Sequence, residues 1–276
     1  MSNVVFTVPR GLGLGVNSER LPDPTAGWHQ AVGALRPAWT HSWGRLAVGP
    51  NYMPSIFPES SGIVPAAQLT EWASRMAAAG YKFQGLTWQI CNEPWCYYQI
   101  TPRDLIDLVK AQDREFRRAN LKARYVFPNE NTNGGNFDRF REYFQEARQE
   151  RLLVTPGAHF WEKGQHLLDT IDNFFDWWAG YGYFSVAMPI VVTECGPGRW
   201  ESMDTWLQTM PTMYALLDKR HPVIGAPMVA ALAPFAAYPK EDAGVERHPG
   251  LMLPDGALTA LGQQYVAERT RRYRTE

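Results

Sequence analysis

The chain has 276 residues, 45% of them hydrophobic and 20% charged, and its formal net charge is −1. This size suits one large α/β domain, and the apolar fraction is ample for a packed core. Basic residues gather only in a short tail at 269–274, so we expect no nucleic-acid partner. The longest weakly polar run, 223–238, holds two prolines and is too short to cross a bilayer, so we expect no membrane span.

The cysteines and the amino terminus exclude further classes of protein. Cys91, Cys96 and Cys195 are odd in number, which does not fit a disulfide framework. The CNEPWC spacing lacks the paired cysteines and histidines of a zinc site, so we expect no metal and a small apolar role for these side chains. The first residues lack a cationic region followed by an apolar core. We therefore expect either a cytoplasmic protein or one released without a secretory signal.

Strand and helix patterns alternate along the chain. Strands are expected at 11–17, 37–44, 50–57, 83–92, 124–127, 154–161, 189–194 and within 223–232. Helices are expected at 28–35, 65–80, 101–116, up to about 151, at 167–178, 206–217 and 258–270. The asparagine-rich segment 128–135 is expected to be a loop that closes the fifth strand.

This alternation predicts a parallel sheet closed as a (β/α)8 TIM barrel, a single domain over residues 1–276. In such barrels the carboxyl ends of the strands build the active site. Two of the expected strands end in a glutamate, Glu93 before Pro94 and Glu194 after a Val/Ile run. A lone glutamate past a strand is commonly a solvated loop residue. The matching positions of these two favour a catalytic pair.

The other strand ends carry amides, imidazoles and flat rings, with few cations. Such groups suit a neutral polyhydroxylated substrate, and the 11 tryptophans include candidates for sugar stacking. An oligo- or polysaccharide is therefore the expected partner, with no cofactor. Glu130 is a rival carboxylate, but its asparagine-rich context favours contact with solvent or substrate over catalysis. The expected substrate-binding residues are Asn17, His41, Trp43, Tyr52, Asn92, Trp95, Asn131, His159 and Trp161.

Sugar chemistry supplies a mechanism for the pair. Cleavage of a glycosidic bond needs a proton for the leaving oxygen and negative charge beside the oxocarbenium-like carbon, so one carboxyl group is protonated and the other ionised. When the two groups lie about 5 Å apart, the ionised one attacks directly and the configuration is retained.

Short motifs resemble those of known enzymes of this kind. The Asn92-Glu93-Pro94 and Thr193-Glu194 sequences are similar to the retaining glycoside hydrolases of clan A, and most similar to family 128, which acts on β-1,3-glucan. The motifs that carry this resemblance are GLGVN, WTHSWG, CNEPW, AHFW and PIVVTEC.

The resemblance also implies roles for single residues. It implies that Glu93 is the acid/base and Glu194 the nucleophile. It implies that Asn92 binds the sugar hydroxyl next to the reacting carbon and that His159 lies near the cleavage site. Trp43 and Trp161 would be sugar-stacking rings.

The sequence therefore predicts a monomeric retaining glycoside hydrolase that cleaves a β-linked glycan, with internal cleavage of β-1,3-glucan as the first candidate. Two alternatives stay open. One is a barrel that binds carbohydrate without catalysis, which the absence of expected tryptophans on the third and eighth strands favours. The other is a transglycosylase that uses the same residues, in which a sugar replaces water as the acceptor.

Overall fold

The computed structural model describes residues 10–18, 21–42, 52–53, 55–56, 63–80, 86–132, 137–152, 154–180, 189–198, 200–242 and 245–273. Strands and helices alternate over most of this range, as the sequence predicts. The strands are β1 (Gly11–Leu12), β2 (Leu14–Gly15), β3 (Thr40–His41), β4 (Tyr52–Met53), β5 (Ser55–Ile56), β6 (Leu86–Ile90), β7 (Ala123–Asn131), β8 (Val154–Trp161), β9 (Ile190–Gly196), β10 (Val229–Leu232), β11 (Lys240–Asp242) and β12 (Val245–His248).

The strands that carry the fold form two parallel sheets. The larger has seven strands in the order β1-β10-β9-β8-β7-β6-β5, and the smaller has three in the order β2-β3-β4. Every neighbouring pair in both sheets is parallel. Gly13 alone separates β1 from β2, and β5 starts two residues after β4 ends. Each edge of the larger sheet therefore continues along the chain into an edge of the smaller one.

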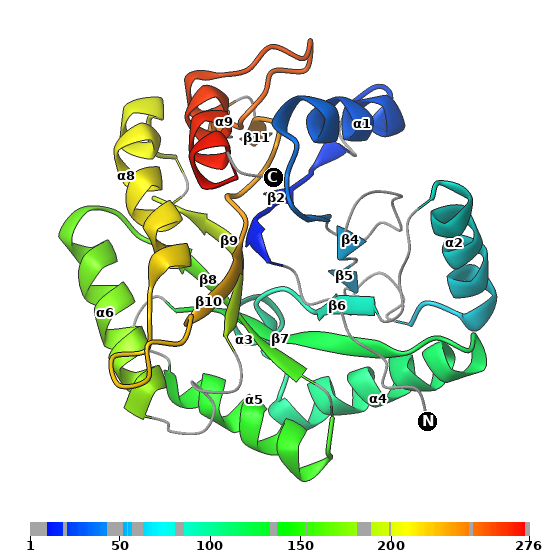
Figure 1. Ribbon diagram of the computed structural model, residues 1–276. Helices are drawn as coiled ribbons and strands as arrows, with labels where there is room; N and C mark the ends of the chain where they lie inside the picture. The colour runs from blue at the N-terminus through cyan, green and yellow to red at the C-terminus, as the bar shows by residue number, and fades with distance from the viewer. Residues whose placement is uncertain are drawn as a thin grey trace.

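Helices lie around the outside of the strands (Figure 1). None of the helices in the described ranges is long and apolar enough to cross a membrane. Their bounds are α1 (Pro24–Leu35), α2 (Ala66–Ala78), α3 (Pro94–Tyr98), α4 (Pro102–Arg118), α5 (Phe137–Gln149), α6 (Gly164–Gly180), α8 (Met203–Ala215), the 3-10 helix η4 (Leu216–Asp218) and α9 (Ala260–Arg272).

Helix α4 illustrates how local sequence sets these bounds. The Thr101 hydroxyl accepts a hydrogen bond from the Asp104 N–H and so caps the first turn. Pro102 occupies the first helical position, where its missing N–H costs nothing. The buried face then follows the helical period, through Leu105, Ile106, Val109, Gln112 and Phe116.

The core consists of two layers of apolar side chains, one on each face of the sheet. Successive residues of a strand point to opposite faces. Along β9, Val191 packs with Trp39, Met53, Val126, Ala231 and Ala233 on the inner face of the strands. Its neighbours Ile190 and Val192 belong to the larger cluster on the helix side. Strand β9 is therefore covered on both faces, which is typical of parallel sheets.

Strand β7 differs from the prediction. The segment from Pro128 to Asn131, expected to be loop, continues the strand and pairs with β8 as far as Asn131 and His159. Proline has no N–H for a regular ladder, which is why the pattern predicted an end there. The ladder instead shifts register between Pro128 and Glu130, and Asn129 takes a left-handed φ of 55° at the shift. Helix α3 and the β11–β12 hairpin were likewise not predicted.

Candidate active site

Glu93 lies where β6 gives way to a helix. It occupies the N-cap of α3 with a left-handed φ of 48°, and Pro94 starts the helix. Its backbone N–H donates to the carbonyl of Asn129 on β7 at 3.0 Å. An N-cap side chain usually accepts a hydrogen bond from the first turn, but that of Glu93 does not. Its carboxylate is therefore available for other contacts, although it is only 4% exposed.

Glu130 on β7 takes over the capping of α3. Its Oε2 accepts the Trp95 N–H at 2.8 Å, and its Oε1 accepts the Asn131 N–H at 3.1 Å. Glu130 is 2% exposed, so the predicted contact with solvent is wrong. Burial raises the pKa of this carboxyl group, while the two N–H donors act in the opposite direction and the charge of Glu93 raises it further.

We expect Glu130→Ala to destabilise the fold. Two backbone N–H groups would lose their acceptor, and an unsatisfied buried group costs about 1–3 kcal/mol. The expected loss in the free energy of unfolding is therefore roughly 2 kcal/mol or more, measured by urea denaturation. Glu142→Ala is the matched control, since this carboxylate is 43% exposed and pairs with Arg139 at the surface. Equal stability of the two variants would contradict the capping role.

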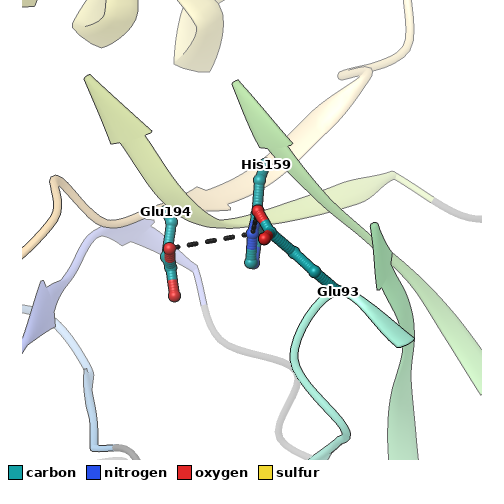
Figure 2. A group of neighbouring side chains, drawn as sticks. All are labelled: Glu93, His159 and Glu194. Carbon is teal, nitrogen blue, oxygen red and sulfur yellow. Dashed lines mark hydrogen bonds and ion pairs between the residues drawn. The ribbon is translucent and has the colours of Figure 1, made fainter. Parts of the chain in front are cut away.

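Glu194 and His159 come from neighbouring strands. They face each other in the register of β9 and β8. The Nδ1 atom of His159 lies 2.9 Å from Oε1 of Glu93 and 3.7 Å from Oε2 of Glu194, so both carboxylates face the same ring nitrogen (Figure 2). One nitrogen and two oxygens of this group lie within 4.8 Å of one another. The structure thus brings together the two predicted catalytic glutamates and one predicted binding residue.

Electrostatics distinguish the two buried imidazoles. Burial lowers the pKa of His159, but the carboxylates of Glu194 and Glu93 outweigh it, and the net shift is upward. His41 stacks on Trp39 with ring centroids 5.6 Å apart. Burial, with a smaller contribution from His159, lowers the pKa of His41 to about 3. His41 is therefore neutral at physiological pH, whereas His159 attracts a proton.

The Glu93, His159 and Glu194 side chains could also be considered as ligands of an ion. However, Nδ1 of His159 and Oε1 of Glu93 already form a hydrogen bond with each other at 2.9 Å. An ion would have to replace that bond.

Two residues behind the site were not among the predicted site residues. The Thr193 hydroxyl lies 2.9 Å from Nε2 of His159 and donates to Oδ1 of Asn129 at 3.1 Å. Asn129 Nδ2 donates in turn to the Val126 carbonyl at 3.0 Å. Simple alternation along β9 places Thr193 and Glu194 on opposite faces, which hid Thr193 from the sequence pattern. Asn129 was a predicted strand end, but nothing in the pattern indicated its partner.

Gly157 on β8 makes room for this network. A Cβ atom there would lie 2.0 Å from Oδ1 of Asn129 and 2.5 Å from Cγ1 of Val126. We expect Gly157→Ala to lower the free energy of unfolding by about 1–3 kcal/mol, as overpacked cores do. Gly33→Ala is the control, because no atom lies within 4 Å of its Cβ. The free energies of unfolding are measured by denaturant titration. An equal change for Gly157→Ala and Gly33→Ala would contradict the close packing at Gly157.

The remaining predicted residues lie in different surroundings. Asn92 accepts a hydrogen bond from Gln89, and Trp95 is covered on one face by the Arg139 guanidinium at 3.9 Å. Trp161 packs its ring against the edges of neighbouring aromatic rings, 4.9 Å between centroids for Phe235. These three side chains, together with Asn131, are partly exposed.

The Asn17 side chain connects its own segment to the distant segment around Tyr238. Its Nδ2 donates to the Tyr238 carbonyl, and its Oδ1 accepts the Tyr238 N–H. Both ends of this amide are thus bonded to protein backbone. Trp43 and the side chain of Tyr52 lie outside the described residues, so their predicted sugar contacts stay predictions.

Three residues at the site adopt left-handed backbone conformations although none is glycine. They are Cys91, Glu93 and Asn129, with φ values of 58°, 48° and 55°. Such conformations are costly, and they cluster at functional sites, where the surrounding structure enforces them. Their position around the carboxylate pair is consistent with a candidate functional site.

Comparison with known proteins gives fold-level matches only. No protein-family profile matches the chain. No curated protein matches it in sequence. Among solved structures, a subgroup VI family 128 exo-β-1,3-glucanase from Aureobasidium namibiae superposes with a TM-score of 0.66 at 15% identity, over 95% of this chain and 97% of that one. The chain has the fold of family 128 glycoside hydrolases.

Further structures support this assignment of fold. A variant of a subgroup I family 128 endo-β-1,3-glucanase from Amycolatopsis mediterranei, in complex with laminaripentaose, superposes with a TM-score of 0.58 at 14% identity, over 94% of this chain and 99% of that one. A plant β-glucan endohydrolase gives 0.55 at 14% identity, over 90% and 98%. The predicted resemblance to family 128 is confirmed at the level of fold.

Proposed function

We propose that the chain is a retaining glycoside hydrolase that cleaves β-glucan with Glu93 and Glu194. The observation that carries this proposal is the approach of the two carboxylates to Nδ1 of His159, with the three atoms concerned within 4.8 Å of one another. Retaining enzymes hold their carboxyl groups about 5–5.5 Å apart, whereas inverting enzymes leave about 6.5–9.5 Å for a water molecule. The separation here favours direct attack.

Each glutamate has a distinct role in this mechanism. Glu194 attacks the anomeric carbon, and its C–O bond forms as the glycosidic bond breaks. Glu93 supplies the proton that the leaving oxygen takes. In the second step Glu93 removes a proton from water, whose oxygen attacks the same carbon and releases Glu194. The two inversions together retain the anomeric configuration.

The architecture around this pair is proposed to be a closed (β/α)8 barrel in one domain, residues 1–276. Support comes from the two parallel sheets, whose edges adjoin along the chain at Gly13 and between Met53 and Ser55. Backbone hydrogen bonds across the first seam, such as Gly13 N–H to the Leu232 carbonyl and Leu14 N–H to the Trp39 carbonyl, support the same closure. The carboxyl ends of all strands would then surround the glutamates.

The substrate is proposed to be a β-1,3-glucan, which the relatives of the same fold are named for. Partly exposed groups beside the glutamates are the proposed sugar contacts, namely Asn92, Trp95, Asn131 and Trp161. Aromatic rings suit the apolar faces of glucose, and amides suit its hydroxyl groups. His41 is fully buried and Asn17 is bonded at both ends to the Tyr238 backbone, so neither is a proposed sugar contact.

The test is a substrate panel. Purified protein is incubated with laminarin, mixed-linkage β-glucan, β-1,6-glucan, mannan, xylan and peptidoglycan, and new reducing ends and product sizes are measured. We expect new reducing ends to be released from laminarin. Internal cleavage would give oligosaccharides of several lengths, and cleavage from a chain end would give one short product. Products longer than the starting oligosaccharide would indicate transglycosylation. Binding without release across the panel would contradict catalysis.

A further inference from the structure

The hydrogen bonds behind His159 run in one fixed direction. The Asn129 amide donates from Nδ2 to the Val126 carbonyl at 3.0 Å, which turns its Oδ1 toward Thr193. The Thr193 hydroxyl has one proton, which it donates to that Oδ1 at 3.1 Å. Its oxygen can then only accept from Nε2 of His159, at 2.9 Å. The ring must therefore carry a hydrogen at Nε2.

This arrangement determines what happens at the other ring nitrogen. With Nε2 protonated, a neutral ring presents a bare Nδ1 to the Glu93 oxygen 2.9 Å away. Two acceptors at that distance repel each other, so one proton must lie between them, on the carboxyl or on the ring. We propose that Thr193 and Asn129 are positioning residues that hold the histidine proton at Nε2, so that His159 and Glu93 share one further proton as a pair.

The neighbouring charges agree with this sharing. Glu194 on β9 lies 3.7 Å from Nδ1, and Glu130 on β7 also acts on the ring, so both favour a proton at the pair. His41 on β3 is neutral and opposes it little. Burial disfavours a charged ring, and the carboxylates outweigh it, which raises the pKa of His159.

The inference deepens the proposed function and rests on it for its catalytic meaning. The pair holds its proton until the glycosidic C–O bond breaks, when the proton passes to the leaving oxygen. The two facing acceptors then draw a proton from water as the water oxygen bonds to carbon and the Glu194–carbon bond breaks. One pair thereby supplies both acid and base.

The first arm of the test is independent of activity. Proton-nitrogen correlation spectra of the ¹⁵N-histidine protein resolve which ring nitrogen is protonated, and the chain has only six histidines. His159→Gln identifies the His159 signals. We expect wild type and Thr193→Ser to keep Nε2 protonated over the whole pH range. A neutral His159 ring with its hydrogen at Nδ1 in the wild type overturns the proposal, even if no Thr193 variant folds.

The second arm uses Thr193→Val, which has the same shape but no hydroxyl. Without an acceptor for the Nε2 hydrogen, the neutral ring carries its hydrogen at Nδ1 instead, where it donates to the Glu93 carboxylate. The pair then binds its proton less tightly. The alkaline limb of the pH-rate profile on laminarin should move to lower pH by about one unit. A shift of one unit has about the same free energy as the net contribution of one ordinary hydrogen bond. Thr193→Ser should restore the wild-type limb.

The control and the outcomes separate this inference from the proposed function. Thr155→Val removes another buried hydroxyl, on β8, whose hydrogen-bond partner is Arg124. Thr155→Val should leave the alkaline limb of the pH-rate profile unchanged. A shift of this limb equal to that of Thr193→Val would overturn the proposal. A wild type that hydrolyses no glycan refutes the proposed function alone, because the nitrogen spectra still decide where the His159 proton lies.

Discussion

We expect Glu194→Ala to reduce turnover of laminarin by roughly 10⁴- to 10⁶-fold, the range seen when an enzyme loses its nucleophile. In the proposed mechanism the variant cannot form the covalent intermediate, and the remaining rate comes from substrate binding and from Glu93. The side chain is nearly buried, so its removal leaves a small cavity beside His159. The measurement is the initial rate of reducing-end release under saturating substrate.

The same cavity offers a positive check on the role of Glu194. Azide is small and anionic, and it should enter the space and attack the anomeric carbon from the same side. The expected product is a glycosyl azide of inverted configuration, formed from an aryl glycoside and identified by NMR. Glu201→Ala is the control, since this carboxylate pairs with Lys163 at the surface. A Glu194→Ala variant that keeps one tenth of the wild-type rate would refute the nucleophile assignment.

The second large effect concerns Glu93 and depends on the leaving group. We expect Glu93→Ala to lower kcat/KM on laminarin oligosaccharides by about 10²- to 10⁴-fold, the usual contribution of a general acid. The dinitrophenolate group of a dinitrophenyl glycoside can leave without a proton. The rate of its cleavage step should therefore fall far less. Both substrates are assayed in parallel, and the loss on laminarin oligosaccharides divided by the loss on the aryl glycoside tests the role of Glu93 as general acid.

The comparison of the two substrates also serves as the control. Glu93→Ala removes one partner of the His159 hydrogen bond, and a general disturbance of the site would slow both substrates alike. Equal losses on the two substrates would therefore contradict the acid/base role. Loss of the alkaline limb from the pH-rate profile of the variant is the accompanying expectation.

The sequence predicted those parts of the site that depend on strand order. Glu93 and Glu194 each follow a run of buried apolar residues, and strand ends in a parallel sheet meet at one edge. Their approach to each other, and to Nδ1 of His159, therefore followed from the pattern. The parallel sheet and most helices followed from the alternation of strand and helix signals in the same way.

The parts that the sequence missed depend on irregular backbone. A proline suggested that β7 ends at Pro128, whereas the ladder resumes after a shift of register. That shift buries Glu130 and Asn129, which the pattern had placed in a loop. Alternation also assigned Thr193 to the face away from the site. Local patterns carry no information on which distant hydrogen bonds will hold such a bulge in place.

The capping of α3 by Glu130 has a consequence for protein engineering. The loop after β6 carries the proposed acid/base, yet its conformation is held by a carboxylate and a carbonyl from β7. A loop grafted from a relative onto β6 alone would arrive without these supports. Transplants at this site should therefore exchange the ends of β6 and β7 together, as one unit.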